Sequence, residues 1–287
     1  LNTLGAAFGC LLAGFFLIGT FGVLETVLTA AAGNLLIGIG ALNVYKENVG
    51  SLKFNLPEIK FPKMDWSAEQ KFWMGISFVC GFTALAYEVL WTRLLVFSIA
   101  STVYSFSMML AVFLLGIFLG SLLLIPLLPK IKNLRTMLIA LQGGVGIYVI
   151  GSIYGLESIL SPPWNAYNLG NPAAAFWIYF KGSAALMLFP TLLLGMCFPL
   201  LIQLISKKHE NIGQATGQVY AANTVGAIFG SLFSGFLFLP NFGSQVSLTL
   251  LATINLLTMV LLFRTGDYLA PAVRKGLTVI FASLILF

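Results

Sequence analysis

Apolar stretches recur along this chain, and each is long enough, at about 20 residues, to cross a bilayer core as a helix. Hydrophobic residues make up 59% of the sequence and charged residues only 8%, which excludes an ordinary soluble domain. A lipid core offers no partners to backbone groups, so each span is expected to be helical. The apolar runs do not alternate with polar residues, which argues against a membrane β-barrel. The sequence therefore predicts an all-α integral membrane protein, built as a multi-span helical bundle.

The order of apolar and polar stretches suggests a division into spans and connections. Nine apolar segments are expected, approximately at 2–20, 23–43, 70–94, 102–128, 134–154, 175–204, 215–239, 245–263 and 272–287. The polar stretch before the third segment reads as a linker, and Ser67 followed by Gln70 fits a capping box that opens the next helix. The last segment is too short to span within the sequence, so we expect it to continue beyond Phe287.

The chain also repeats itself. Asn2 to Gly9 (NTLGAAFG) reappear 221 positions later as Asn223 to Gly230 (NTVGAIFG). Further identities continue in register at Leu11/Leu232, Gly14/Gly235, Phe15/Phe236, Phe21/Phe242, Gly22/Gly243, Asn34/Asn255, Leu35/Leu256 and Leu36/Leu257. Duplicated bundles are a common way to build transporters.

The repeat divides the chain into four parts. We expect 1–43 to hold the last two spans of a first, truncated repeat that begins before Leu1. A cytoplasmic linker at 44–69 then leads to a second six-span repeat at 70–263. The remaining residues, 264–287, are expected to form a cytoplasmic loop and the start of a further span.

Lysine and arginine predict the orientation of the spans. Of the 15 basic residues, 13 lie in alternate connections, at Lys46–Lys71, Lys130–Arg135, Lys207–Lys208 and Arg264–Lys275. The positive-inside rule places those connections in the cytoplasm, and we expect a multi-pass protein of a bacterial inner membrane. Because the net charge of +6 comes mainly from these connections, the lipid bilayer is the expected partner and nucleic acid is not.

The residues that metal sites and disulfides require are scarce. Cys10, Cys80 and Cys197 all fall inside apolar spans, and the chain has one histidine. We interpret these cysteines as small buried hydrophobic residues and expect no metal site, disulfide framework or cofactor. With no nucleophile–base arrangement in the sequence, we expect no catalytic residues and no enzyme activity within these 287 residues.

Charged residues inside spans are the main functional candidates, because a charge in hydrocarbon is unfavourable. They are Glu25, Glu88, Arg93 and Lys181. Glu88 and Arg93 diverge by about 140° around one helix, so each is expected to find a partner elsewhere, and Lys181 is a candidate for Glu88. Two interpretations stay open: a structural ion pair, or a substrate or proton site. Glu25 lies near a span start and fits an interfacial position.

Small and helix-bending residues mark packing positions. Glycines four residues apart occur at Gly5/Gly9, Gly116/Gly120 and Gly226/Gly230, and we expect them to bring helices together within the bundle. Pro190 and Pro199 are expected to bend the sixth segment. Asn223 forms a polar notch whose repetition at Asn2 favours a role in helix packing.

Several motifs together resemble a known family. They are Gly81–Arg93 (containing YEVLWTR), Ser101–Phe106, Gly116–Ser121, Gly195–Leu200 and Tyr220–Ala227 (YAANTVGA). In order and spacing they resemble the membrane domain of bacterial fused major-facilitator-like/spermidine synthase-like proteins, over most of 70–263. The resemblance implies a major-facilitator-like six-helix repeat. The candidate substrate-binding residues are Tyr87, Glu88, Arg93, Lys181 and Asn223.

The resemblance does not extend to a catalytic domain. Fused members of that family carry a soluble polyamine aminopropyltransferase-like domain, which needs a nucleotide-binding sheet and a glycine-rich loop. The sequence contains no strand–GxGxxG–helix unit.

Three functions therefore remain open. The chain is a noncatalytic transporter-like or small-molecule-binding membrane domain, a structural or accessory subunit of a larger membrane complex, or the membrane anchor of an aminopropyltransferase-like domain of the same gene product.

Overall fold

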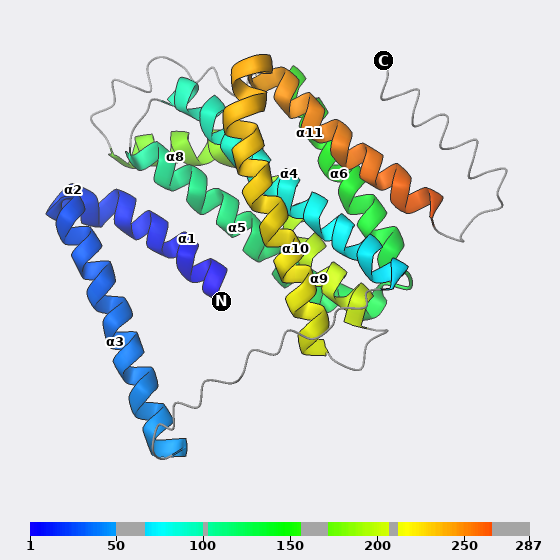
Figure 1. Ribbon diagram of the computed structural model, residues 1–287. Helices are drawn as coiled ribbons and strands as arrows, with labels where there is room; N and C mark the ends of the chain where they lie inside the picture. The colour runs from blue at the N-terminus through cyan, green and yellow to red at the C-terminus, as the bar shows by residue number, and fades with distance from the viewer. Residues whose placement is uncertain (50–66, 100–102, 156–171, 207–211, 266–287) are drawn as a thin grey trace.

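The computed structural model describes residues 1–49, 67–99, 103–155, 172–206 and 212–265, and helices dominate all of them (Figure 1). The helices are α1 (Asn2–Leu12), α2 (Ile18–Phe21), α3 (Val23–Val49), α4 (Ala68–Ile99), α5 (Val103–Leu127), α6 (Leu134–Tyr154), α8 (Pro172–Ser183), α9 (Phe189–Ser206), α10 (Ile212–Phe233) and α11 (Leu239–Arg264). Three π-turns, at Ala13–Leu17, Ala184–Leu188 and Ser234–Phe238, continue α1, α8 and α10. A short 3₁₀ turn, Leu128–Lys130, follows α5.

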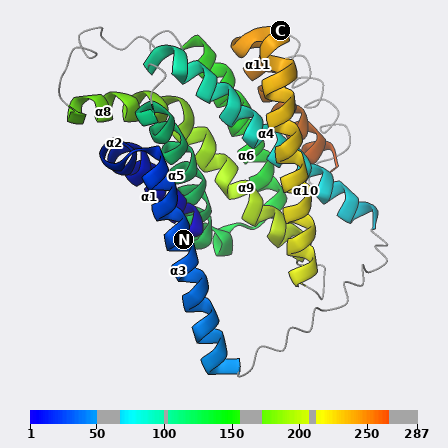
Figure 2. The same cartoon turned by 60° about the vertical axis from the view of Figure 1, so that its left-hand side comes forward.

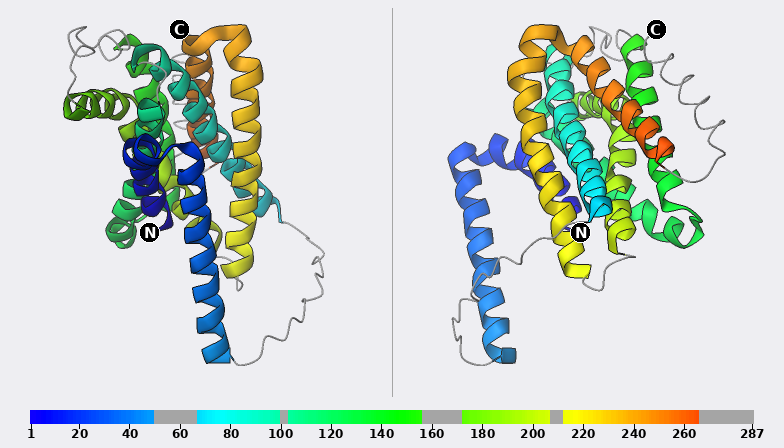
Figure 3. Two further views of the ribbon diagram at one scale, coloured as in Figure 1. Left: turned by 90° about the vertical axis from the view of Figure 1, so that its left-hand side faces the viewer. Right: turned by 45° about the vertical axis from the view of Figure 1, so that its right-hand side comes forward.

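The expected membrane character is confirmed. Seven helical stretches of the described residues are long and apolar enough to cross a membrane. The last of them, Thr216–Arg264, is a pair of antiparallel helices, α10 and α11, that separate at Gly243 (Figure 3). The first eight predicted segments thus coincide with helices, while the ninth, 272–287, lies outside the described residues, as do residues 50–66 of the linker.

The predicted capping box at the start of α4 is present. The Gln70 backbone N–H donates to the Ser67 hydroxyl at 3.2 Å, and the Ser67 backbone N–H donates to the Gln70 side-chain oxygen at 2.8 Å. This reciprocal pair satisfies two groups that a helix start leaves without partners.

Helices pair across the bundle in a regular pattern (Figures 1 and 2). Within 67–265, α4 packs on α10, α5 packs on α9 and α6 packs on α11. From the first repeat copy, α1 packs on α5, while α3 extends away from the bundle (Figure 1). The bundle interior holds two apolar clusters, one around Trp91 and Leu186 and the other around Trp73 and Leu200.

Glycines set the close approach of α4 and α10. A Cβ added at any of three positions would overlap the backbone carbonyl of the facing helix: Gly81 against Asn223, Gly226 against Phe78 and Gly230 against Phe82. Without a driving force from water, helices in lipid associate through close backbone contact of this kind.

Hydrogen bonds follow the same seam between α4 and α10. The Ser77 hydroxyl donates to the Val219 carbonyl at 2.9 Å, and the Asn223 side-chain amide donates to the Ser77 carbonyl at 3.2 Å. Further along, the Ser234 hydroxyl donates to the Ala86 carbonyl at 3.1 Å. Small residues and short polar side chains therefore join the two helices over most of their length.

Glycines also set the close approach of α5 and α9. A Cβ added at Gly116 would overlap the Thr191 side chain, and one added at Gly120 or Gly195 would overlap a backbone carbonyl of the facing helix. The expected packing role is confirmed for Gly116, Gly120, Gly226 and Gly230. The pair in the first copy differs, because a Cβ at Gly5 or Gly9 meets nothing within 4 Å.

The sixth span is bent, as its prolines predict. α8 runs across the bundle and α9 runs along it (Figure 2), with the π-turn Ala184–Leu188 between them. Pro190, the second residue of α9, has no backbone N–H to donate. Proline and π-turns are both frequent causes of helix kinks. Pro199 lies inside α9.

Arg135 joins three helices at one end of the bundle. Its Nε donates to the Leu262 carbonyl at 3.1 Å, and its Nη2 donates to the Thr265 hydroxyl. The guanidinium lies 5.6 Å from the ring centroid of Phe72 and 5.4 Å from that of Trp73. The last carbonyls of a helix lack partners within it, so Arg135 satisfies the end of α11. The starts of α4 and α6 and the end of α11, each of which borders a connection with basic residues, therefore meet at this end.

The two segments that repeat in sequence share the same backbone irregularities. The π-turns Ala13–Leu17 and Ser234–Phe238 occupy matching positions, 221 residues apart. Each is followed by a left-handed glycine, Gly22 with φ 86° and Gly243 with φ 71°. In both copies the hydroxyl four residues later donates a hydrogen bond to that glycine's carbonyl, with oxygen–oxygen distances of 2.7 Å for Thr26 and 2.5 Å for Ser247.

Candidate functional site

A chain of polar side chains crosses the bundle interior. The Tyr87 hydroxyl on α4 donates to Asn255 Oδ1 on α11 at 2.8 Å, and Asn255 Nδ2 donates to Gln142 Oε1 on α6 at 2.7 Å. All three side chains are fully buried. Gln142 lies eight residues into α6, or about 12 Å from the helix start, which is deep within a membrane core of about 30 Å.

Two cysteines complete this polar chain. Gln142 Nε2 lies 3.2 Å from Cys80 Sγ and 3.5 Å from Cys197 Sγ. Cys80 and Cys197 are buried in the cluster around Trp73, whereas Tyr87 belongs to the cluster around Trp91. The polar chain thus lies at the boundary between the two apolar clusters and ties together α4, α6, α9 and α11.

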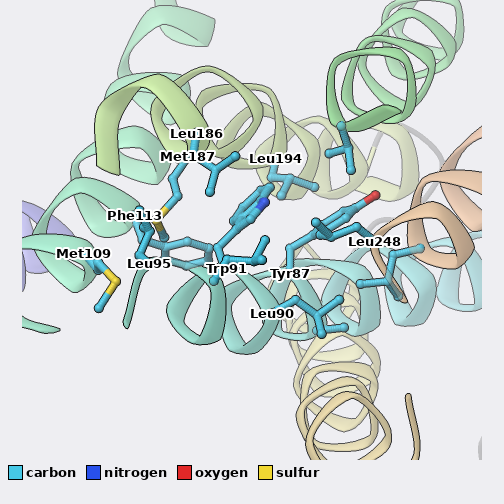
Figure 4. Packing of buried hydrophobic residues seen from close by; sticks show 14 of the residues in the cluster. Tyr87, Leu90, Trp91, Leu95, Met109, Phe113, Leu186, Met187, Leu194 and Leu248 are labelled. Carbon is cyan, nitrogen blue, oxygen red and sulfur yellow. The ribbon is translucent and has the colours of Figure 1, made fainter. Parts of the chain in front are cut away.

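Tyr87 and Trp91 form the aromatic centre of the cluster around Trp91 and Leu186 (Figure 4). Their rings stack with centroids 4.9 Å apart and an interplanar angle of 12°. Figure 4 shows the Tyr87 hydroxyl and the Trp91 nitrogen pointing in different directions, with Trp91 toward Leu186 and Met187. Among the described residues, Trp91 Nε1 and Ser183 Oγ are buried atoms that have no hydrogen-bond partner.

The Glu88 side chain is not part of the hydrogen-bonded chain formed by Tyr87, Asn255 and Gln142. It directly follows Tyr87, and its side chain is only partly buried. Within the described part of the chain, its carboxylate makes no hydrogen bond and no ion pair. It lies within electrostatic range of the Cys10 thiol on α1. Cys10 belongs to α1, which packs mainly on α5, so Glu88 of the second repeat copy lies near a residue of the first.

The other predicted site residues lie in different surroundings from Glu88. Arg93 on α4 and Lys181 at the end of α8 are both exposed, whereas Glu88 is partly buried. Asn223 binds the Ser77 carbonyl in the α4–α10 seam, and Tyr87 binds Asn255. Asn223 and Tyr87 therefore hold helices together, and of the five candidates only Glu88 combines partial burial with an unsatisfied charge.

An apolar cavity of about 370 Å³ lies between α1, α5 and α8. Its lining includes Leu4, Phe8, Met108, Val112, Trp177 and Phe180. Such a lining offers no hydrogen-bond partner to a polar ligand, so this cavity suits a hydrocarbon chain.

Sequence reasoning missed Gln142 and Asn255. Within the spans, only charged residues and Asn223 were expected to have a role, and the amides Gln142 and Asn255 were not. The sequence did contain a signal for both residues, because an amide inside an apolar span needs a hydrogen-bond partner from another helix. Cys80 and Cys197 were correctly expected to be buried, whereas Cys10 is only partly buried. The contact of Cys80 and Cys197 with the Gln142 amide was not expected.

No family model, curated protein or solved structure matches this chain. Function therefore has to be argued from the residues themselves, and Glu88 is a partly buried acid on a spanning helix with no hydrogen bond or ion pair among the described residues.

Proposed function

We propose that this chain is a noncatalytic, transporter-like membrane domain that binds a cationic small molecule at Glu88. The observation that carries the proposal is the Glu88 carboxylate, which lies on a membrane-spanning helix and has no polar partner among the described residues. A carboxylate in a lipid environment is stabilised by an opposite charge, and its default interpretation is functional. An amine or other organic cation supplies that charge.

The position of Glu88 between two repeat copies supports this assignment. Ligand sites of transporters built from repeats lie where the repeats meet. Glu88 lies within electrostatic range of Cys10 on α1 of the first copy. Trp91, one turn further along α4, has a buried donor with no hydrogen-bond partner in the described part of the chain.

The finer features of the proposal rest on the sequence. The six helices of 70–263 are proposed to form a major-facilitator-like half in a bacterial inner membrane, with the basic connections in the cytoplasm. The meeting of three such connections at Arg135 is consistent with that orientation. An aminopropyltransferase-like domain of the same gene product stays a possible soluble partner.

A structural or accessory subunit is the second candidate. The observation in its favour is that the polar chain from Tyr87 to Gln142 is internally satisfied and that Arg93 and Lys181 are exposed.

Ligand-dependent thermal stabilisation in detergent tests the first candidate. We expect at least one compound among polyamines, amino acids and thioether nucleosides to stabilise the protein, by about 2.7 kcal/mol at a hundredfold excess over Kd. The variant Glu88→Gln removes the charge with little change in shape, so it should lose this stabilisation. Glu25→Gln, at an exposed acid on α3, is the matched control and should keep it. An equal response from the Glu88→Gln protein, or no response to any compound, would exclude a cation site at Glu88.

A further inference from the structure

The apolar cavity between α1, α5 and α8 lies on one side of the bundle, where Figures 1 and 2 show these three helices close together. Its volume is about 370 Å³, and every residue that lines it is aliphatic, aromatic or methionine. A cavity with such a lining stays free of water and accepts apolar molecules. The part of a ligand that fills it is therefore hydrocarbon.

The cavity opens toward the outer surface of the bundle. Phe8 on α1 and Trp177 on α8 both line it, and their side chains are 66% and 56% exposed. Met108 and Val112 on α5 also line it and are both only 1% exposed, so they form a buried wall. Exposed apolar side chains of a membrane-spanning bundle face lipid tails. The hydrocarbon that enters this cavity therefore comes from the bilayer and not from water.

Lys181 places a positive charge beside this opening. It lies one turn after Trp177 on α8, so the two side chains project from the same side of the helix. It also directly follows Phe180, another residue of the cavity lining. The lysine is exposed, and within the described part of the chain it makes no hydrogen bond or ion pair. A lysine in a spanning segment is stabilised by an anion or by reaching the headgroup region.

The helices that form the cavity carry charge of one sign. α1, α5 and α8 contain no aspartate or glutamate, and Lys181 is their single charged residue. A phosphate at Lys181 therefore meets no like charge from these helices. The ammonium group of a zwitterionic headgroup, in contrast, finds no acid on them. The charge pattern thus favours a headgroup with a net negative charge.

We propose that this cavity is the binding site of one anionic phospholipid. An acyl chain lies between α1, α5 and α8, and the phosphate lies at the Lys181 ammonium. Trp177 lies where the chain meets the headgroup, which is the level at which tryptophan is enriched in membrane proteins. The inference is independent of the ligand proposed at Glu88, because Glu88 does not line this cavity.

Fluorescence quenching by lipids with brominated acyl chains tests the site. The protein is purified in a nonionic detergent and titrated with phosphatidylglycerol or phosphatidylcholine that carries the same brominated chains. The part of the quenching that Trp177→Phe removes reports on Trp177. We expect this part to saturate, and phosphatidylglycerol to reach half-saturation at a several-fold lower concentration than phosphatidylcholine.

Two variants separate the headgroup from the chain. Lys181→Gln should weaken the binding of phosphatidylglycerol about fivefold, as expected for one lysine at an anionic headgroup, and should leave phosphatidylcholine unchanged. Lys132→Gln, at an exposed lysine outside the cavity lining, should change neither. Ala111→Phe fills the cavity from α5 and should remove saturable quenching by both lipids. The unfolding temperature without lipid shows whether each variant is folded, and the exposed Lys181 position supplies a test even where Ala111→Phe is not.

Three results would overturn the proposal. They are equal affinities for the two lipids, an unchanged affinity of Lys181→Gln for phosphatidylglycerol, and quenching that rises with lipid concentration without saturating. Inorganic phosphate is the last probe, and it should not displace phosphatidylglycerol at equal concentration, because it has no chain to fill the cavity. Equal competition by phosphate would mean that the cavity contributes nothing to binding and would also contradict the proposal.

Discussion

Replacing Gly230 with leucine is expected to abolish most of the folded protein. A Cβ at this position already overlaps the Phe82 carbonyl of α4, and a backbone carbonyl cannot move aside as a side chain can. Overpacking typically destabilises a protein by 1–3 kcal/mol, and we expect about 3 kcal/mol or more here, because α4 and α10 must separate. Recovery of monodisperse protein in mild detergent, followed by thermal unfolding, measures the effect.

Two controls isolate the role of the helix contact. Gly217→Leu on α10 and Gly75→Leu on α4 introduce the same side chain where a Cβ meets nothing within 4 Å. Leucine has the higher helix propensity, so these variants should fold at least as well as the parent. Comparable losses at Gly75, Gly217 and Gly230 would mean that close approach of α4 and α10 is not what holds the bundle together.

Replacing Asn255 with leucine is expected to destabilise the bundle by about 2 kcal/mol. Leucine and asparagine share the same branched arrangement of four side-chain heavy atoms, so the shape is largely kept, but Tyr87 loses its acceptor and Gln142 loses its donor. A buried group left without its partner typically destabilises by 1–3 kcal/mol. Single interhelical hydrogen bonds in membrane proteins contribute less to stability, about 0.6 kcal/mol on average. We expect a larger loss here because one substitution leaves two buried groups, the Tyr87 hydroxyl and the Gln142 side-chain oxygen, without their partner.

A double-mutant cycle separates the hydrogen bond from general disruption. In an Asn255→Leu background, Tyr87→Phe should have a smaller effect than in the parent, since its hydroxyl has already lost its acceptor. Asn241→Leu is the matched control, because Asn241 is an exposed asparagine on the same helix that binds only the Leu237 carbonyl nearby. Strictly additive effects of the Tyr87 and Asn255 changes would show that the two side chains are not coupled.

The helices were predictable because hydrocarbon leaves the backbone only one option. Long apolar runs fixed the first eight spans, and local chemistry fixed details such as the Ser67–Gln70 capping box. Four-residue glycine spacing also predicted close helix contacts. A helix face without Cβ atoms lets the backbone carbonyls of a facing helix approach, and the glycine spacing alone shows where such a face lies. It could not predict which face of α1 would be open, because that depends on which partner helix is present.

The candidate site was harder to predict because it depends on contacts between distant segments. Tyr87 and Asn255 are 168 positions apart, and no local pattern indicates that their side chains meet. The sequence singled out Glu88, Arg93 and Lys181 as charges in apolar spans, but only the packing of the helices shows that Glu88 is partly buried while Arg93 and Lys181 are exposed. The register of the repeat did match Asn34 with Asn255, but that Asn255 is buried and Asn34 exposed became visible only in three dimensions.

Sidedness of the connections tests the central claim, a helical bundle that spans the membrane with its basic connections on one face. Single cysteines at Lys132→Cys and Asn241→Cys, both exposed positions, are introduced into a Cys10→Ala parent and treated with a membrane-impermeant maleimide. We predict that intact spheroplasts label the Asn241 position, and that the Lys132 position reacts only after the membrane is opened. Labelling of both positions from the same side would contradict the account.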